Sequence, residues 1–253
     1  MHASSADRSC AVWLSDPSFA AAEIARSIGY GAVVLDIEHG AFDLADLERF
    51  VPFARAVGME VLAKVLGPER GPIQQALDFG ADAVVIPHVE SVAHAREVTA
   101  FAKFPPRGDR SFAGGRTTGY GGMSDEWVAE QDAATRCLPM VEDAGALADL
   151  PAILDLDTVD GVFVGPSDLS LRRERGAYTR DDGDFADLAT IADCCATAGK
   201  PWVLPAWSTA EKEFAVRHGA DQIALIMQHG ALAAGFNAPF EQLAQIRAAE
   251  SSG

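Results

Sequence analysis

Two acidic residues stand directly after short apolar runs in the middle of the chain. Glu142 closes the segment Leu138-Pro-Met-Val-Glu142, and Asp168 follows the segment Gly161-Val-Phe-Val-Gly-Pro-Ser167. If the apolar runs are strands, both carboxylates project from strand ends, where α/β proteins place their active sites. Carboxylate oxygens, completed by water and substrate oxygens, suit Mg²⁺ or Mn²⁺, with Co²⁺ and Zn²⁺ as alternatives. The sequence therefore predicts a divalent-metal site held by Glu142 and Asp168.

The same two residues also have a simpler interpretation as parts of helix starts. Asp168 could cap the short helix that follows it, and Glu142 could be an acidic residue placed against a helix N-terminus. In the catalytic interpretation, the backbone N–H groups of Ser167 and Asp168 form a nest for a substrate carboxylate. Both interpretations stay open at this point.

Three polar residues follow another apolar run, in the segment Val33-Val-Leu-Asp-Ile-Glu-His-Gly40. An imidazole exchanges protons near neutral pH, so His39 is the candidate general base. Asp36 or Glu38 would orient His39 or a neighbouring cation. A single histidine is more often structural, and its catalytic role here depends on the two acidic motifs.

The pattern of hydrophobic residues indicates how these distant side chains come together. Short β-branched runs alternate with amphipathic segments, such as 44–57 and 92–103, over the whole chain, as in repeated strand–helix units. Eight such alternations predict an α/β fold with a single (β/α)8 TIM barrel over residues 1–253, of which 1–9 form a flexible N-terminal tail. All the candidate residues then lie at one rim. The predicted strands are Ala11–Leu14, Ala32–Ile37, Glu60–Val65, Ala83–Pro87, Cys137–Val141, Gly161–Val164, Trp202–Leu204 and Gln222–Ile226.

Composition limits the function classes. The chain carries 37 acidic and 20 basic residues, a net charge of −17, which disfavours binding to nucleic acid or to an anionic membrane. Its 4 cysteines show no Cys-x-x-Cys spacing, so neither a zinc knuckle nor a disulfide framework is indicated. The first residues lack the apolar core of a signal peptide, and no apolar run is long enough to span a membrane. We expect a cytoplasmic protein. Two long loops, 104–124 and 171–184, are predicted to be functional, although the charged second loop could also be a solvated surface segment.

Together these motifs resemble the metal-dependent 2-oxo-acid aldolase family typified by 2,4-dihydroxyhept-2-ene-1,7-dioate aldolase, within the citrate lyase-like barrel superfamily. The resemblance covers most of the chain and rests on Asp36–Gly40, Asp78–Ala81, Val85–Glu90, Pro105–Arg110 and Gly161–Ser170. It implies a homohexamer in which Glu142 and Asp168 bind the metal, and the metal binds a 2-oxo acid such as pyruvate. It further implies that His39 moves protons and that Asp78 reaches this base from a neighbouring subunit.

This sequence departs from the family pattern beside the predicted metal site. Lys64 stands where the family usually carries an arginine, and it lacks the planar fork that binds a carboxylate through two hydrogen bonds. Met140 stands where a glutamine is common, His88 where an apolar residue is common, and Trp207 follows a late strand. The predicted substrate contacts are Lys64, Met140, Ser167, Asp168 and Trp207.

The leading hypothesis is therefore a divalent-metal-dependent carbon–carbon lyase of the class II aldolase type that acts on a non-standard substrate. It would cleave or form a bond next to a 2-oxo acid, with an aldehyde or related carbonyl as the second partner. In one alternative, Lys64 forms a Schiff base with the substrate and no metal is needed. In the other, the barrel has lost catalysis and only binds an anionic metabolite.

Overall fold

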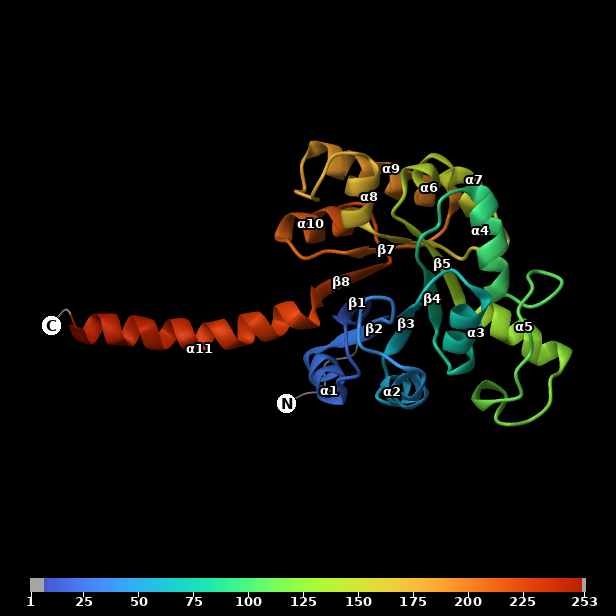
Figure 1. The fold of residues 1–253 in the computed structure, drawn as a ribbon, viewed down its shortest axis with the longest axis horizontal. Helices are drawn as coiled ribbons and strands as arrows, with labels where there is room; N and C mark the ends of the chain where they lie inside the picture. The colour runs from blue at the N-terminus through green and yellow to red at the C-terminus, as the bar shows by residue number, and fades with distance from the viewer. Residues whose placement is uncertain (1–6, 252–253) are drawn as a thin grey trace.

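The computed structural model describes residues 7–251 and contains a closed barrel of eight parallel strands in the order β1 to β8. Each strand pairs with the next along the chain, and β8 pairs with β1 (Figure 1). The predicted (β/α)8 architecture is confirmed. Of the predicted tail, residues 1–6 lie outside the described residues, whereas 7–9 already belong to β1, because Asp7 pairs with Tyr30 of β2.

The elements alternate as the hydrophobic pattern predicts. The strands are β1 (Asp7–Leu14), β2 (Tyr30–Asp36), β3 (Glu60–Lys64), β4 (Ala83–Ile86), β5 (Arg136–Val141), β6 (Val162–Val164), β7 (Trp202–Pro205) and β8 (Gln222–Met227). The helices are α1 (Phe19–Ile28), α2 (Leu44–Ala56), α3 (Arg70–Asp78), α4 (Val92–Thr99), α5 (Asp125–Ala134), α6 (Ala144–Ala148), α7 (Leu150–Leu154), α8 (Pro166–Arg172), α9 (Asp182–Ala198), α10 (Thr209–Arg217) and α11 (Gln228–Ser251). Two short 3-10 helices, Ala100–Ala102 and Arg116–Thr118, lie in the β4–β5 connection.

Local side-chain chemistry sets where several helices begin. The carboxylate of Asp43 accepts from the backbone N–H of Asp46, whose own carboxylate accepts from the N–H of Asp43, which closes a capping box at the start of α2. Asp181 and Asp184 form the same arrangement at α9. These caps fix the points at which the chain turns from the rim of the barrel into each helix.

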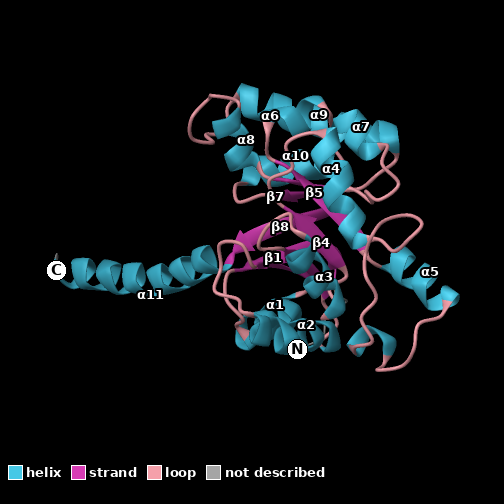
Figure 2. Cartoon of the chain, turned by 45° about the vertical axis from the view of Figure 1, so that its right-hand side comes forward, coloured by secondary structure: helices cyan, strands magenta, loops and turns pink. Residues whose placement is uncertain are grey.

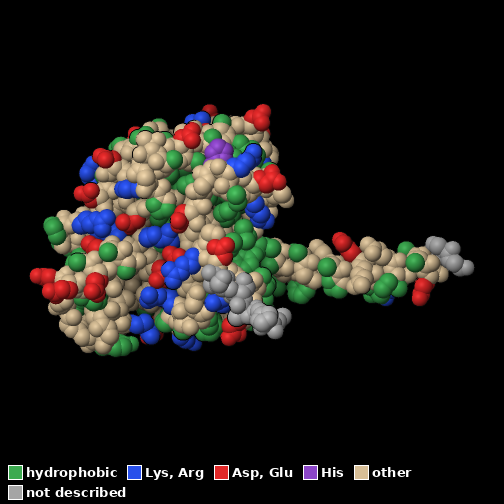
Figure 3. Space-filling model, turned by 180° about the vertical axis from the view of Figure 1, so that it is seen from behind, with side chains coloured by type: hydrophobic (Ala, Val, Ile, Leu, Met, Phe, Trp, Pro, Cys, Tyr) green, Lys and Arg blue, Asp and Glu red, His purple; other side chains and the backbone are tan. Residues whose placement is uncertain are grey.

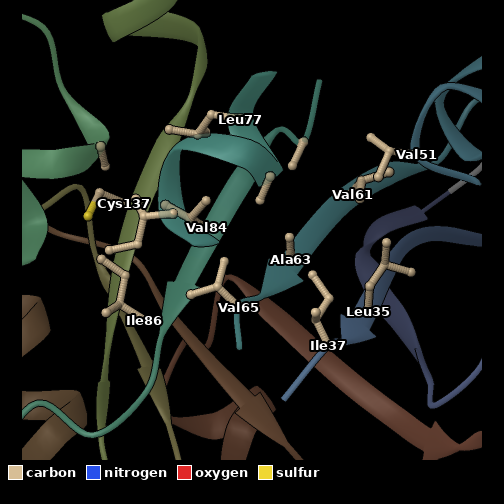
Figure 4. Packing of buried hydrophobic residues seen from close by; sticks show 14 of the residues in the cluster. Leu35, Ile37, Val51, Val61, Ala63, Val65, Leu77, Val84, Ile86 and Cys137 are labelled. Atoms are coloured by element: carbon tan, nitrogen blue, oxygen red, sulfur yellow. The ribbon is translucent and has the colours of Figure 1, made fainter. Parts of the chain in front are cut away.

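Apolar side chains fill two layers. Alternate strand residues point into the barrel and form an inner cluster that includes Trp13, Leu62 and Phe163, all at most 6% exposed. The opposite strand faces pack against the surrounding helices; Figure 4 shows this outer layer beside β2 to β5, where Leu35, Val61 and Ile86 lie among side chains such as Val51 of α2 and Leu77 of α3. Because both faces of these strands are buried, their sequences are continuous apolar runs.

Beyond its first turn, the last helix does not pack on its own barrel. Figures 1 and 2 show α11 extending away from the strands as a straight projection. Of its residues only Gln228 is buried, whereas Phe236 is 72% and Phe240 75% exposed. No helix within residues 7–251 is long and apolar enough to cross a membrane.

Candidate functional site

The carboxyl ends of the strands bring the candidate residues to one rim. Asp36, the last residue of β2, pairs directly with Lys64, the last residue of β3. Glu142 follows β5, and Asp168 lies in the first turn of α8 after β6. Since β5 and β6 are neighbours, the two acids follow adjacent strands at the mouth, close enough for the charge of Asp168 to act on Glu142.

Lys64 is held between two carboxylates at the base of this mouth. Its side chain is only 5% exposed, and Nζ donates to Asp36 Oδ1 at 3.2 Å and to Glu38 Oε2. Asp36 also accepts from the indole Nε1 of Trp13 at 3.2 Å. A lysine ammonium has three donors, so these two carboxylates leave one for other partners.

Two histidines converge on the other oxygen of Glu38. His39 Nε2 lies 3.5 Å from Glu38 Oε1, and His88 Nε2 lies 2.5 Å from the same atom. The His39 side chain is 67% exposed, so it faces the open mouth, and its backbone N–H is fixed by Asp36 Oδ1 at 3.2 Å. The geometry therefore places Glu38 where it can orient the predicted base.

Glu142 is buried and tightly surrounded. Its side chain is 7% exposed, and Oε1 accepts from the backbone N–H of His88 at 2.6 Å. Gly165 lies against it: a Cβ at this glycine would stand 2.7 Å from Glu142 Oε2 and 3.0 Å from Met140 Cε. The close approach of β5 and the start of α8 therefore requires glycine here.

Burial raises the pKa of Glu142, and the negative charge of Asp168 raises this pKa further, although hydrogen bonding and charge from His88 act against both effects. The two carboxylates thus repel each other, and a cation between them would relieve this repulsion. No group of three or more His, Cys, Asp or Glu side chains arranged to hold a metal occurs within residues 7–251. A pair of carboxylates completed by water and substrate is nevertheless the set that Mg²⁺ accepts, so the residues fit a divalent cation.

The structure assigns both helix caps to other residues, while Glu142 directly precedes the N-cap of α6 and Asp168 lies in the first turn of α8. The N-cap of α6 is Asp143, whose Oδ1 accepts from Gly145 N at 2.7 Å, and not Glu142. The N-cap of α8 is Gly165, without a side-chain cap, while Ser167 and Asp168 are exposed in the first turn. Both acids are free of a capping role.

The predicted substrate contacts on the apolar side lie at different depths. Met140 is 3% exposed and belongs to the inner cluster of the barrel. Trp207 is half-buried above this cluster, and its ring meets Trp13 edge-on at 6.0 Å between centroids. Trp13 in turn contacts Phe163 at 5.8 Å. These rings form an apolar wall beside Lys64.

Asp78 lies elsewhere within this chain. It ends α3, which returns the chain to the amino-terminal side of the barrel, and its Oδ1 accepts from Arg110 Nη2 at 2.8 Å. Arg110 belongs to the long loop 104–124, so this ion pair ties the loop to α3. The role of Asp78 across a subunit boundary stays a prediction, as does a functional role for the loop 171–184, where Arg175 bonds Asp184 and Asp187 at 3.1 and 2.6 Å.

Sequence reasoning left two contacts of this site unassigned. Trp13 sits at an inward position of β1, and its indole donor could have been matched to a polar residue at a neighbouring strand end. His88 stood out as a polar residue at the mouth, but its two carboxylate partners depend on distances across three strands. No spacing in the sequence encodes those distances.

The sequence profile of the HpcH/HpaI aldolase/citrate lyase family matches residues 9–233. The chain belongs to this family. Among similar proteins, 2-keto-3-deoxy-L-rhamnonate aldolase of Klebsiella pneumoniae is 35% identical over 160 residues, which cover 63% of this chain and 60% of that protein. The counterpart from Salmonella gallinarum is 32% identical over 165 residues, 65% of this chain and 62% of that protein. The alignments thus span less than two thirds of these relatives.

Solved structures of the HpcH/HpaI family match over nearly the whole barrel. A family protein from Burkholderia cenocepacia is 25% identical, covers 95% of each chain and gives a TM-score of 0.84. The HpcH/HpaI aldolase of Desulfitobacterium hafniense, at 24% identity, covers 94% of this chain and 93% of its own with a TM-score of 0.86. The latter similarity supports the fold alone.

Proposed function

We propose that this chain is a divalent-metal-dependent carbon–carbon lyase of the class II aldolase type. The observation that carries the proposal is the pair of adjacent carboxylates, Glu142 and Asp168, beside the buried cation Lys64. Glu142 and Asp168 would hold Mg²⁺ or Mn²⁺, with Co²⁺ or Zn²⁺ as alternatives. A 2-oxo acid such as pyruvate and an aldehyde or related carbonyl are the proposed partners of the reaction.

The chain's own groups can perform the proton transfers of an aldol cleavage. His39, oriented by Glu38, takes the proton from the substrate hydroxyl, and an aldehyde forms as the carbon–carbon bond releases its electron pair to the 2-oxo acid. Lys64 places positive charge beside the resulting enolate. His39 then returns the proton to the enolate carbon, which yields the 2-oxo acid. The metal, when bound, supplies Lewis-acid stabilisation of the enolate charge.

Lys64 and Met140 support a substrate that differs from the usual one of the family. Two of the three lysine donors point to Asp36 and Glu38, and the methionine offers no hydrogen bond beside the metal ligands. The relatives are named for a 2-oxo acid, 2-keto-3-deoxy-L-rhamnonate, which supports a 2-oxo acid as the substrate class.

A cytoplasmic location is part of the proposal, because all four cysteines are free thiols, as expected in a reducing compartment.

The Schiff-base alternative is less well supported by the geometry. A lysine attacks a carbonyl through a free electron pair on Nζ, whereas this Nζ donates to two carboxylates. The Schiff-base mechanism would also leave the Glu142 and Asp168 pair without a role.

Solvent exchange at the methyl group of pyruvate tests the enzyme proposal against the non-catalytic barrel. Protein stripped with chelator and then supplied with Mg²⁺, Mn²⁺, Co²⁺ or Zn²⁺ is incubated with pyruvate, or with longer 2-oxo acids, in D₂O. We expect deuterium incorporation, followed by NMR, that requires metal and stops when chelator is added. If no metal supported exchange with any 2-oxo acid, the lyase proposal would be wrong.

We also propose that the chain is a homo-oligomer, a hexamer by resemblance, and that α11 contacts a second copy. In a complete barrel, the helix after β8 covers the seam between β8 and β1, but here α11 leaves that seam. Leu225 and Ile226 of β8 are only partly buried, and the helices that flank β1 and β8 in the chain, α1 and α10, expose Ile28 by 66% and Val216 by 71%. Figure 3 shows hydrophobic side chains gathered where α11 meets the barrel.

The helix itself carries a matching apolar stripe. Its large exposed apolar residues recur every three or four positions and therefore share one face. They are Leu232, Phe236, Phe240, Leu243 and Ile246. The open seam and the free stripe are complementary in chemistry, and a reciprocal exchange of α11 between two copies would bury both.

Acidic substitutions on this stripe should break the assembly. We expect F236E/F240E to shift the protein toward the monomer, because two charges cannot be buried in an apolar seam without a partner. Light scattering coupled to size-exclusion chromatography measures the mass. The matched control N237E/Q245E adds the same number of acids away from the stripe and should keep the wild-type mass. An F236E/F240E protein with wild-type mass would contradict the exchange of α11.

A further inference from the structure

His88 occupies an unusual backbone position directly after β4. Its φ is +59°, in the left-handed region that only a few per cent of residues other than glycine adopt. The side chain is 51% exposed, so burial of the ring does not explain this conformation. The conformation does aim both the backbone N–H and the ring toward carboxylates.

The polar contacts of His88 reach residues that follow two different strands. Its backbone N–H donates to Glu142 Oε1 at 2.6 Å and its Nδ1 lies 3.6 Å from the same atom, while its Nε2 lies 2.5 Å from Glu38 Oε1. Glu38 then binds Lys64 through its other oxygen. One residue therefore links the candidate metal ligand after β5 to the ion pair between β2 and β3.

His88 contacts only one of the two oxygens of the Glu142 carboxylate. Oε1 is held by His88, while Oε2 lies against Gly165, at the start of the helix that carries Asp168. Oε2 is thus the oxygen beside the segment that leads to Asp168. A fixed Oε1 keeps Oε2 in that position.

We propose that His88 is a positioning residue that ties Glu142 to the Glu38–Lys64 ion pair, and so fixes the metal relative to the lysine that faces the substrate. This inference rests on the proposed function. The tie has two parts: the backbone N–H orients Glu142, and the ring, anchored on Glu38, keeps that N–H in place.

Mn²⁺ affinity of the chelator-stripped protein, measured by isothermal titration calorimetry, tests the tie. His88→Gly keeps the N–H and accepts a positive φ, but it loses the ring. We expect it to bind Mn²⁺ about tenfold more weakly or worse, in the range found when a residue that supports a metal ligand is removed. His94→Ala, which changes a histidine of α4, should bind like the wild type.

A double-mutant cycle tests whether Glu38 and His88 affect Mn²⁺ affinity together or independently. Glu38→Gln weakens the anchor of the ring, so we expect it to reduce Mn²⁺ affinity, and to reduce it much less when His88 is already glycine. Additive effects, or a His88→Gly protein with wild-type affinity, would overturn the proposal. His88→Asn, which also tolerates this φ, repeats the measurement if the glycine variant does not fold. If the wild type bound Mn²⁺ and Asp168→Ala did not, the proposed function would stand even if the tie failed; if the wild type bound none, both would fall.

Discussion

Asp168→Ala should abolish metal-dependent turnover and leave the barrel folded. Asp168 is exposed in the first turn of α8 and does not cap it, so its loss should change the free energy of unfolding by no more than about 0.5 kcal/mol. As one of two proposed protein ligands, its loss should lower turnover by more than about a hundredfold, beyond the effect expected of a supporting residue. Deuterium exchange into the 2-oxo acid measures turnover, and a thermal melt by circular dichroism measures folding.

The same substitution has a second consequence at Glu142. The charge of Asp168 raises the pKa of Glu142, so this pKa should fall when Asp168 becomes alanine. The control Asp193→Ala removes an exposed acid from α9 and should retain full exchange. Retained metal-dependent exchange in Asp168→Ala would show that the ligand assignment is wrong.

Lys64→Arg should increase the exchange of pyruvate by about tenfold or more. A guanidinium has five donors, so it can satisfy Asp36 and Glu38 and still present donors to a substrate carboxylate. One additional charge-assisted hydrogen bond contributes about 1.5–3 kcal/mol, which sets this magnitude. The dependence of exchange rate on pyruvate concentration separates improved binding from faster chemistry, and Lys212→Arg on α10 is the matched control.

Removal of the lysine charge should instead destabilise the fold. Lys64→Met leaves Asp36 and Glu38 without their buried cation, and loss of one partner of a buried ion pair costs about 3–5 kcal/mol. Urea unfolding measures this loss. Lys64 would have neither a substrate role nor a structural role if two results were found together. The Lys64→Arg protein would exchange pyruvate no faster than the wild type, and the Lys64→Met protein would be as stable as the wild type.

The strands were predictable because they are apolar on both faces. Runs such as 83–87 and 202–204 stand out from the charged helices around them, and the observed β4 and β7 differ from them by one residue. At β1 the strand begins four residues before the predicted Ala11, because polar residues at its exposed start carry no hydrophobic signal. Local pattern thus gave the order of elements and the rim at which Glu142 and Asp168 meet.

The contacts within the site were not predictable in the same way. The bond from Trp13 to Asp36 depends on barrel register, and the contact of His88 with Glu38 depends on a positive φ and on loop curvature. Likewise, the apolar stripe on 232–246 indicates a helix that packs against another apolar surface. The stripe does not indicate whether that surface belongs to the same barrel or to a second copy. These contacts join residues that are far apart in the sequence and meet only in the closed fold or between copies.

Gly165 limits how this site can be redesigned. Any side chain there would collide with Glu142, so a mutational library at this position should yield active clones only with glycine. Gly40 is equally constrained, since a Cβ would stand 2.1 Å from the carbonyl oxygen of Asp36. Met140, in the inner cluster, and Trp207, packed above that cluster, lie on the apolar side of the site and do not hold the proposed metal. Attempts to broaden the range of accepted substrates should therefore diversify these two residues and keep both glycines fixed.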